Sequence, residues 1–185
     1  MTLANKLTCL RMVLVVPFLI FASLRYFFHG ATTIPFILLS VIVFVVASIT
    51  DYFDGKIARA TNTVTDFGKL LDPLADKLLT FSLLFVLVKY NRISVLLVCI
   101  MLVREFVVTY ERIYLTRLGY GVMPASIYGK IKTAVTMVTL VIILMLPANK
   151  ILYSILILPA CILTVISGVD YHLKASKIVR GDENE

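Results

Sequence analysis

The chain has 185 residues, of which 60% are hydrophobic and 16% are charged, and its mean hydropathy is +0.97. An average soluble domain is about half apolar and about one quarter charged, so this composition excludes an ordinary soluble domain and predicts an integral membrane protein. The length predicts one domain, residues 1–185. The net charge is +7, but no motif supports nucleic-acid binding, and we expect no nucleic-acid partner.

Six apolar runs predict an all-α, polytopic membrane protein with six transmembrane helices. The three longest runs are residues 12–28, 34–50 and 151–169. Residues 78–88, 93–103 and 134–146 are shorter than the roughly 20 residues that a span needs, so these helices must include polar neighbours. If the chain crosses the membrane six times, the polar neighbours of the three short runs all lie at the same end. This pattern predicts a polar cavity in one leaflet.

The distribution of Lys and Arg predicts the orientation. With both termini in the cytoplasm, fourteen of the eighteen Lys and Arg residues lie on the cytoplasmic side, as the positive-inside rule requires. We therefore expect a multi-pass protein of the cell membrane whose site lies at the cytoplasmic membrane interface. The basic C-terminal segment, with Lys174, Lys177 and Arg180, suits anionic membrane lipids, although topology alone also accounts for it.

Three polar residues near the start of the chain are Asn5, Thr8 and Arg11. They are spaced by three residues and would face one way at the start of a helix. Asn5 suits the N-cap position of that helix. Pro17 predicts a kink within the first span, because proline removes a backbone hydrogen bond.

Five of the eleven acidic residues fall between positions 51 and 76. Asp51 and Asp54 are three apart and Asp72 and Asp76 are four apart, so each pair shares a face if its segment is helical. Two such helices would bring four carboxylates into one pocket, where like charges destabilise one another unless protons or cations intervene. Oxygen ligands favour Mg²⁺, Mn²⁺ or Ca²⁺, and four carboxylates would balance two divalent ions. The alternative is a solvated acidic loop between two helices.

Residues 61–67 predict a polar turn between the two aspartate pairs. Asp66 lies in this turn, where it would cap a helix or contact a ribose. Gly68 is predicted to open the third helix, and Pro73 fits within its first turn.

A second group of charges follows the fourth apolar run: Arg104, Glu105 and Arg112. Charged residues at such depth line a cavity or pair with one another. Residues 115–129 read as a cytoplasmic loop, and Lys130 and Lys132 then open the fifth helix. The two lysines and the helix N-terminus would hold a phosphate. Anchoring to the cytoplasmic side is the alternative role.

The spacing around the aspartates resembles the signature of the CDP-alcohol phosphatidyltransferases. The pattern is D-x-x-D-G-x-x-A-R, then eight residues, then G-x-x-x-D-x-x-x-D. Its fixed positions are Asp51, Asp54, Gly55, Ala58, Arg59, Gly68, Asp72 and Asp76. Eight residue types at fixed spacing make this a specific signal.

The resemblance implies six transmembrane helices, commonly in a homodimer, and transfer of a phosphatidyl group from CDP-diacylglycerol to an alcohol with release of CMP. It implies that Asp51, Asp54, Asp72 and Asp76 hold Mg²⁺ or Mn²⁺, and that Asp76 is also the general base. Gly55, Ala58, Arg59 and Gly68 would hold the CDP part, with Asp66 and Thr8 as further nucleotide contacts.

The acceptor is predicted from the cations around the cavity. Arg104, Arg112, Lys130 and Lys132 favour a phosphate-bearing acceptor, and the stretches that contain them look like those of family members that use sn-glycerol 3-phosphate. Cardiolipin synthases of the same family, which use phosphatidylglycerol, look similar here, so that acceptor is the alternative.

Two functions of other classes are compatible with intramembrane carboxylates. An ion-coupled transporter would place them in an ion pathway, but the inverted repeats and broken helices typical of transporters are not visible in the sequence. A scaffold that binds a metal without catalysis would need neither Arg59 nor Asp76.

Overall fold

The fold was analysed in a computed structural model. It describes the backbone of residues 3–28, 30–60, 66–120, 126–146 and 149–180, and the side chains of residues 9–28, 30–50, 77–120, 126–146 and 149–180. Within these residues the secondary structure is helical, and no strand occurs. The predicted all-α class is therefore confirmed for the part of the chain that is described.

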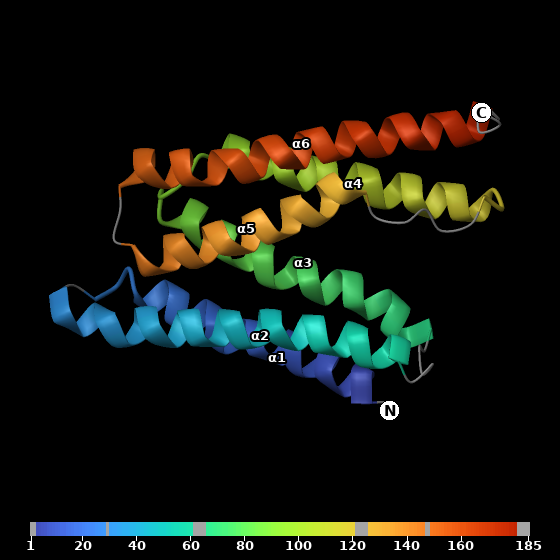
Figure 1. The fold of residues 1–185 in the computed structure, drawn as a ribbon. Helices are drawn as coiled ribbons and strands as arrows, with labels where there is room; N and C mark the ends of the chain where they lie inside the picture. Colours follow the sequence, from blue (N-terminus) through green and yellow to red (C-terminus); the bar gives the residue numbers. More distant parts are fainter. Residues whose placement is uncertain (1–2, 29, 61–65, 121–125, 147–148, 181–185) are drawn as a thin grey trace. The chain divides into compact units, whose positions relative to one another are not determined.

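The described part of the chain contains six α-helices and one short 3₁₀ helix (Figure 1). They are α1 (Leu3–Leu24), η1 (Gly30–Thr33), α2 (Ile34–Ala60), α3 (Asp66–Lys89), α4 (Val95–Arg117), α5 (Ile127–Met145) and α6 (Lys150–Arg180). Among the described residues, three stretches are long and apolar enough to cross a membrane: Gly30–Thr50, Ile127–Met145 and Lys150–Arg180. This is the composition of a membrane protein.

Several predicted boundaries were wrong. Helix α1 begins at Leu3, so Asn5 lies inside the helix and is not its N-cap, and Pro73 lies beyond the first turn of α3. The third helix begins at Asp66 rather than at Gly68, so Asp66 belongs to the helix and not to the preceding turn. The predicted loop 115–129 is shorter, because α4 continues to Arg117 and α5 begins at Ile127. Glycine and proline in this stretch suggested a longer break, but Gly129 lies inside the first turn of α5.

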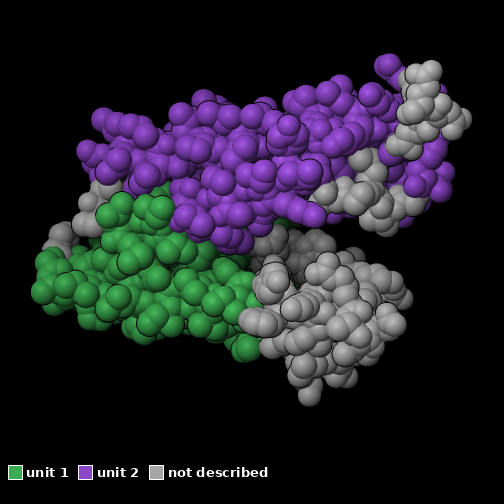
Figure 2. Space-filling view, viewed as in Figure 1, with its two compact units in different colours: residues 1–92, 140–148 green, residues 93–139, 149–185 purple. Residues whose placement is uncertain are grey.

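The helices form two compact units, which are coloured separately in Figure 2. Unit 1 contains residues 1–92 and 140–148, and unit 2 contains residues 93–139 and 149–185. Within unit 1, α1 packs against α2 and α3. Helices α1 and α2 run in opposite directions, and α3 begins at the end of the unit where α2 finishes (Figure 1). Within unit 2, α4 packs against α6.

Buried residues recur on each helix of unit 1 at alternating intervals of three and four. This spacing is typical of a helix with one face turned to a core. The buried stripes are Arg11, Val15, Phe18 and Ala22 on α1, Ser40, Phe44 and Ala47 on α2, and Leu79, Leu83 and Val86 on α3. The rings of Phe18 and Phe44 meet with their centroids 5.5 Å apart, so the stripes of α1 and α2 face each other.

Arg25 ties α1 to the end of α5 within unit 1. Its side chain is buried, and its guanidinium donates to the carbonyl oxygens of Ile143 at 3.1 Å, Leu144 at 2.7 Å and Leu146 at 2.6 Å. The last carbonyl groups of a helix have no partner within the helix itself. Arg25 satisfies these groups at the C-terminus of α5, and its own charge is satisfied by them.

Candidate active site

The aspartate positions of the signature lie on two helices of unit 1. Asp51 and Asp54 fall in the second half of α2, and Asp72 and Asp76 fall in the first half of α3. Both segments are helical, as predicted, so each pair is placed on one helix face. The aspartate side chains lie outside the described residues.

Helical spacing relates these positions to the core of unit 1. On α2 the buried stripe at Ser40, Phe44 and Ala47 reaches position 51 after four more residues and position 54 after three more. On α3 the same alternation leads backwards from Leu83 and Leu79 to positions 76 and 72. The aspartate positions are therefore extensions of faces that are apolar and buried elsewhere.

The two helix ends that carry the aspartates are close in the chain. Only residues 61–65 separate the end of α2 from the start of α3, a connection that spans at most about 20 Å. The predicted nucleotide contacts lie in the same three helices. Gly55, Ala58 and Arg59 occupy the last turns of α2, Asp66 and Gly68 the first turn of α3, and Thr8 the second turn of α1. Their side chains are outside the described residues.

Among the side chains that the structure does describe, no group of three or more His, Cys, Asp and Glu residues gathers at a possible metal site. Four carboxylates from two adjacent helix ends suit a hard divalent cation, because Mg²⁺ and Mn²⁺ prefer oxygen ligands. The donor set of the signature therefore fits the metal that the family resemblance implies.

The predicted acceptor residues belong to unit 2, and Glu105 brings two of them together. The guanidinium of Arg104 donates from Nη1 to Oε1 of Glu105 at 3.1 Å. The ammonium of Lys132, on α5, pairs with the same oxygen. The side chains of Arg104, Glu105 and Lys132 are 13%, 16% and 15% exposed, so this cluster is largely shielded from solvent and carries one surplus positive charge.

Helix α6 also contacts the side chain of Arg104, through Ser167 and Gly168. Nη2 of Arg104 donates to Oγ of Ser167 at 2.8 Å, and Oγ of Ser167 donates to the carbonyl oxygen of Thr164 at 3.1 Å. A Cβ atom at position 168 would lie 2.9 Å from Cγ and 3.3 Å from Nε of Arg104. Glycine is therefore the residue that leaves space for this arginine against α6.

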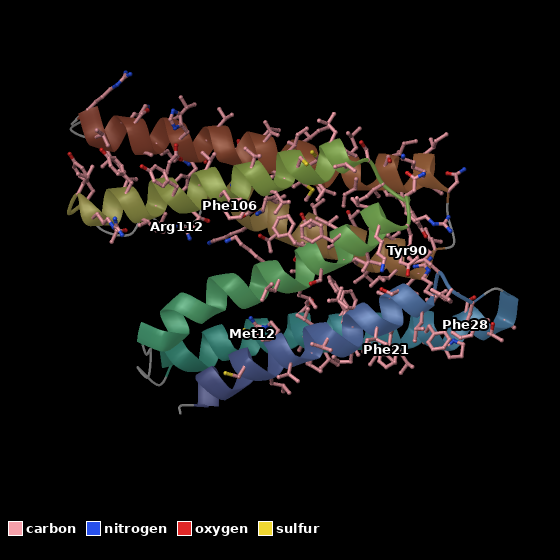
Figure 3. All side chains as sticks on the ribbon, turned by 180° about the vertical axis from the view of Figure 1, so that it is seen from behind. Met12, Phe21, Phe28, Tyr90, Phe106 and Arg112 are labelled. Atoms are coloured by element: carbon pink, nitrogen blue, oxygen red, sulfur yellow. The ribbon has the colours of Figure 1, made fainter. Side chains whose placement is uncertain are left out.

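Arg112 and Lys130, the other two predicted acceptor residues, are both exposed. Arg112 is exposed and lies seven residues beyond Glu105 on α4 (Figure 3), with its guanidinium carbon 5.7 Å from the centroid of the Tyr171 ring. Lys130 is exposed in the first turns of α5. Next to Arg112, Oε1 of Glu111 lies 2.5 Å from Nδ1 of His172.

The contacts of Ser167 and Gly168 on α6 with Arg104 were not predicted from the sequence. Ser167 and Gly168 stand in an apolar segment, where their residue types resemble helix-packing positions. The sequence offered only a weak signal, a serine beside a glycine within an apolar segment. Only the pairing of α4 with α6 reveals these contacts.

The chain belongs to the CDP-alcohol phosphatidyltransferase family, whose model matches residues 1–166. It is therefore a transferase enzyme of phospholipid synthesis. A CDP-diacylglycerol–glycerol-3-phosphate 3-phosphatidyltransferase of Bacillus subtilis (strain 168) is 36% identical over 182 residues, covering 93% of this chain and 94% of the relative.

Two further relatives have names of the same kind. An enzyme of Rickettsia bellii (strain RML369-C) with the same name as the B. subtilis relative is 40% identical over 146 residues, which cover 76% of this chain and 80% of the relative. A probable phosphatidylglycerophosphate synthase of Mycobacterium tuberculosis (strain ATCC 25618 / H37Rv) is 38% identical over 181 residues, which cover 97% of this chain and 84% of the relative.

The space at Gly168 yields a prediction for stability. In the variant Gly168→Ala the new methyl group must displace Arg104, and such overpacking costs about 1–3 kcal/mol. We expect the unfolding temperature of the detergent-purified protein to fall by several degrees. Gly129→Ala is the matched control, because its Cβ would meet only Oγ of Ser126 at 3.5 Å, an ordinary contact. Equal unfolding temperatures for the two variants would contradict the tight contact at position 168.

Proposed function

We propose that this chain transfers the phosphatidyl group of CDP-diacylglycerol to sn-glycerol 3-phosphate, giving phosphatidylglycerophosphate and CMP. The observation that carries the proposal is the near full-length match to a relative with this activity in its name, over 182 residues. The cation cluster of unit 2 supports the acceptor. Arg104 and Lys132 converge on Glu105 with a surplus positive charge, which suits a phosphate-bearing acceptor better than a neutral one.

The proposed setting is the cell membrane, with six spans, both termini in the cytoplasm and the site at the cytoplasmic interface. The three long apolar stretches and the excess of Lys and Arg in the connections assigned to the cytoplasm support this orientation. The chain would act as a single catalytic domain, residues 1–185, in a homodimer surrounded by membrane lipids.

In the proposed mechanism Asp51, Asp54, Asp72 and Asp76 hold two Mg²⁺ or Mn²⁺ ions. When bound, these ions supply positive charge toward the pyrophosphate of the donor. Gly55, Ala58, Arg59 and Gly68 hold the CDP part, with Asp66 and Thr8 nearby. The small residues let the nucleotide approach the helix backbone, and Arg59 supplies a planar fork for a phosphate.

The acceptor is oriented by its own phosphate, for which Arg104, Arg112, Lys130 and Lys132 are the candidate partners. Asp76 takes the proton from the acceptor hydroxyl, and the hydroxyl oxygen attacks the phosphorus atom that carries the diacylglycerol. A new P–O bond forms to the acceptor as the P–O bond to CMP breaks, and the bonding electrons leave with CMP.

The acceptor is tested by measuring CMP release from CDP-diacylglycerol by the purified protein in the presence of Mg²⁺. We expect release with sn-glycerol 3-phosphate and none above background with phosphatidylglycerol. Release only with phosphatidylglycerol would replace the proposed reaction with cardiolipin synthesis. Release with neither acceptor would contradict both acceptor assignments.

The role of Asp76 is tested with the variant Asp76→Asn. An amide cannot take the hydroxyl proton and is a weaker metal ligand, so we expect kcat to fall by at least about 100-fold, the lower range for loss of a general base. The unfolding temperature serves as the control for folding. A variant that keeps wild-type kcat would remove Asp76 from the mechanism, whereas a variant that loses only its fold would show a collapsed melting transition.

A further inference from the structure

Arg11 on α1 is a buried charge that the proposed mechanism does not use. Its side chain is 1% exposed, and it is the first described member of the buried stripe that continues through Val15, Phe18 and Ala22. The guanidinium of arginine stays protonated in proteins. Burying such a charge is costly unless it is paired or hydrogen-bonded, so Arg11 must face oxygen acceptors, either carbonyl groups like those that hold Arg25 or a carboxylate.

The acidic residues of unit 1 are confined to one short segment. Unit 1 comprises residues 1–92 and 140–148, and its acidic residues are Asp51, Asp54, Asp66, Asp72 and Asp76. The other six acidic residues of the chain all belong to unit 2. A carboxylate that balances Arg11 from within unit 1 must therefore be one of these five aspartates, four of which are signature positions.

The register between α1 and α2 selects Asp51 among them. The rings of Phe18 and Phe44 are in contact, and the two helices run in opposite directions (Figure 1). Arg11 lies seven residues before Phe18, and Asp51 lies seven residues after Phe44. Seven residues are close to two full turns, or about 10 Å. Positions 11 and 51 therefore lie at the same level, each on the face that its helix turns to the other.

We propose that Arg11 is a positioning residue whose guanidinium balances Asp51 and holds this carboxylate in place at the head of the aspartate cluster. A guanidinium that donates to one carboxylate oxygen leaves the other oxygen for a metal ion. The charge also lowers the repulsion among neighbouring carboxylates when no cation is bound. The link to metal binding rests on the proposed function, whereas the pairing itself does not.

The pairing is tested by a double-mutant cycle on the full chain in detergent, with EDTA present so that no metal contributes. The unfolding temperature is measured for wild type, Arg11→Met, Asp51→Asn and the double variant. We expect the change in unfolding temperature caused by Asp51→Asn to be more positive by about 3 °C or more in the Arg11→Met background than in wild type. Without Arg11, the substitution removes a negative charge that is no longer balanced. Arg25→Met is the matched control. Arg25 is also a buried arginine, just after α1, but carbonyl groups hold it. Its effect on the unfolding temperature should therefore add to that of Asp51→Asn.

The register between α1 and α3 gives Asp76 as a second candidate partner of Arg11. Tyr26 and Tyr90 stack with their centroids 4.6 Å apart; Arg11 lies fifteen residues before Tyr26, and Asp76 lies fourteen before Tyr90. The cycle is therefore repeated with Asp76→Asn. If Arg11→Met does not fold, Arg11→Lys, which keeps the charge but loses the fork, replaces it. Additive effects with both aspartates would overturn the proposal and leave Arg11 with backbone or hydroxyl partners.

The positioning role has its own readout in the transferase assay. Loss of a residue that orients a metal ligand costs about 10–100-fold in metal affinity, so Arg11→Met should raise the Mn²⁺ concentration for half-maximal activity by about 10-fold or more. Arg11→Lys should lie between wild type and Arg11→Met, and Arg25→Met should leave the value unchanged. An unchanged value in Arg11→Met would overturn the positioning role. A chain without transferase activity would refute the proposed function and leave the EDTA cycle to decide the pairing.

Discussion

Arg25, Arg104 and Lys132 each place a positive charge among apolar helices, and each charge is held by oxygen atoms that another helix supplies. Unpaired charges at such positions would cost more free energy than the packing around them returns. The requirement for a partner therefore decides which helices must lie together. It ties α1 to the end of α5 in unit 1, and α4 to α5 and α6 in unit 2.

Arg25 differs from Arg104 and Lys132 in the kind of group that holds its charge. Arg25 binds backbone carbonyl groups, which are fixed in place by the helix that carries them. Arg104 and Lys132 share one carboxylate oxygen of Glu105, so a phosphate that approached them would compete with a single side chain. The proposed acceptor site uses an arrangement of this second kind, in which two cations are already gathered around one carboxylate.

The family, the all-helical class and the helical setting of the aspartates were predictable from the sequence, because they depend on local properties. Residue spacing fixes which positions share a helix face, and hydropathy identifies the apolar segments. The contacts of Arg25 with α5 and of Arg104 with Ser167 were not predictable. They join residues more than sixty positions apart, and no local pattern marks either partner. The start of α3 at Asp66 was missed for a different reason: an acidic residue in a polar stretch suits both a turn and the first turn of a helix.

The same core positions the two helix segments that carry the aspartates. The stripes of Phe18, Phe44 and Leu83 align three helices through apolar contacts, and the signature positions continue two of those stripes toward the end of unit 1. Apolar packing thus sets the spacing of the polar site, and substitutions in the core should be felt at the aspartates through the helix axes.

The central claim is that the four signature aspartates form one site for two divalent ions. Electron paramagnetic resonance of the purified protein titrated with Mn²⁺ tests it most directly, since it reports both the number of bound ions and their mutual distance. The account predicts about two Mn²⁺ ions per chain with the exchange-broadened signal of a close pair, as in sites whose ions are about 4 Å apart, and loss of this signal in Asp51→Asn. Isolated ions without coupling, or binding that persists unchanged in Asp51→Asn, would contradict it.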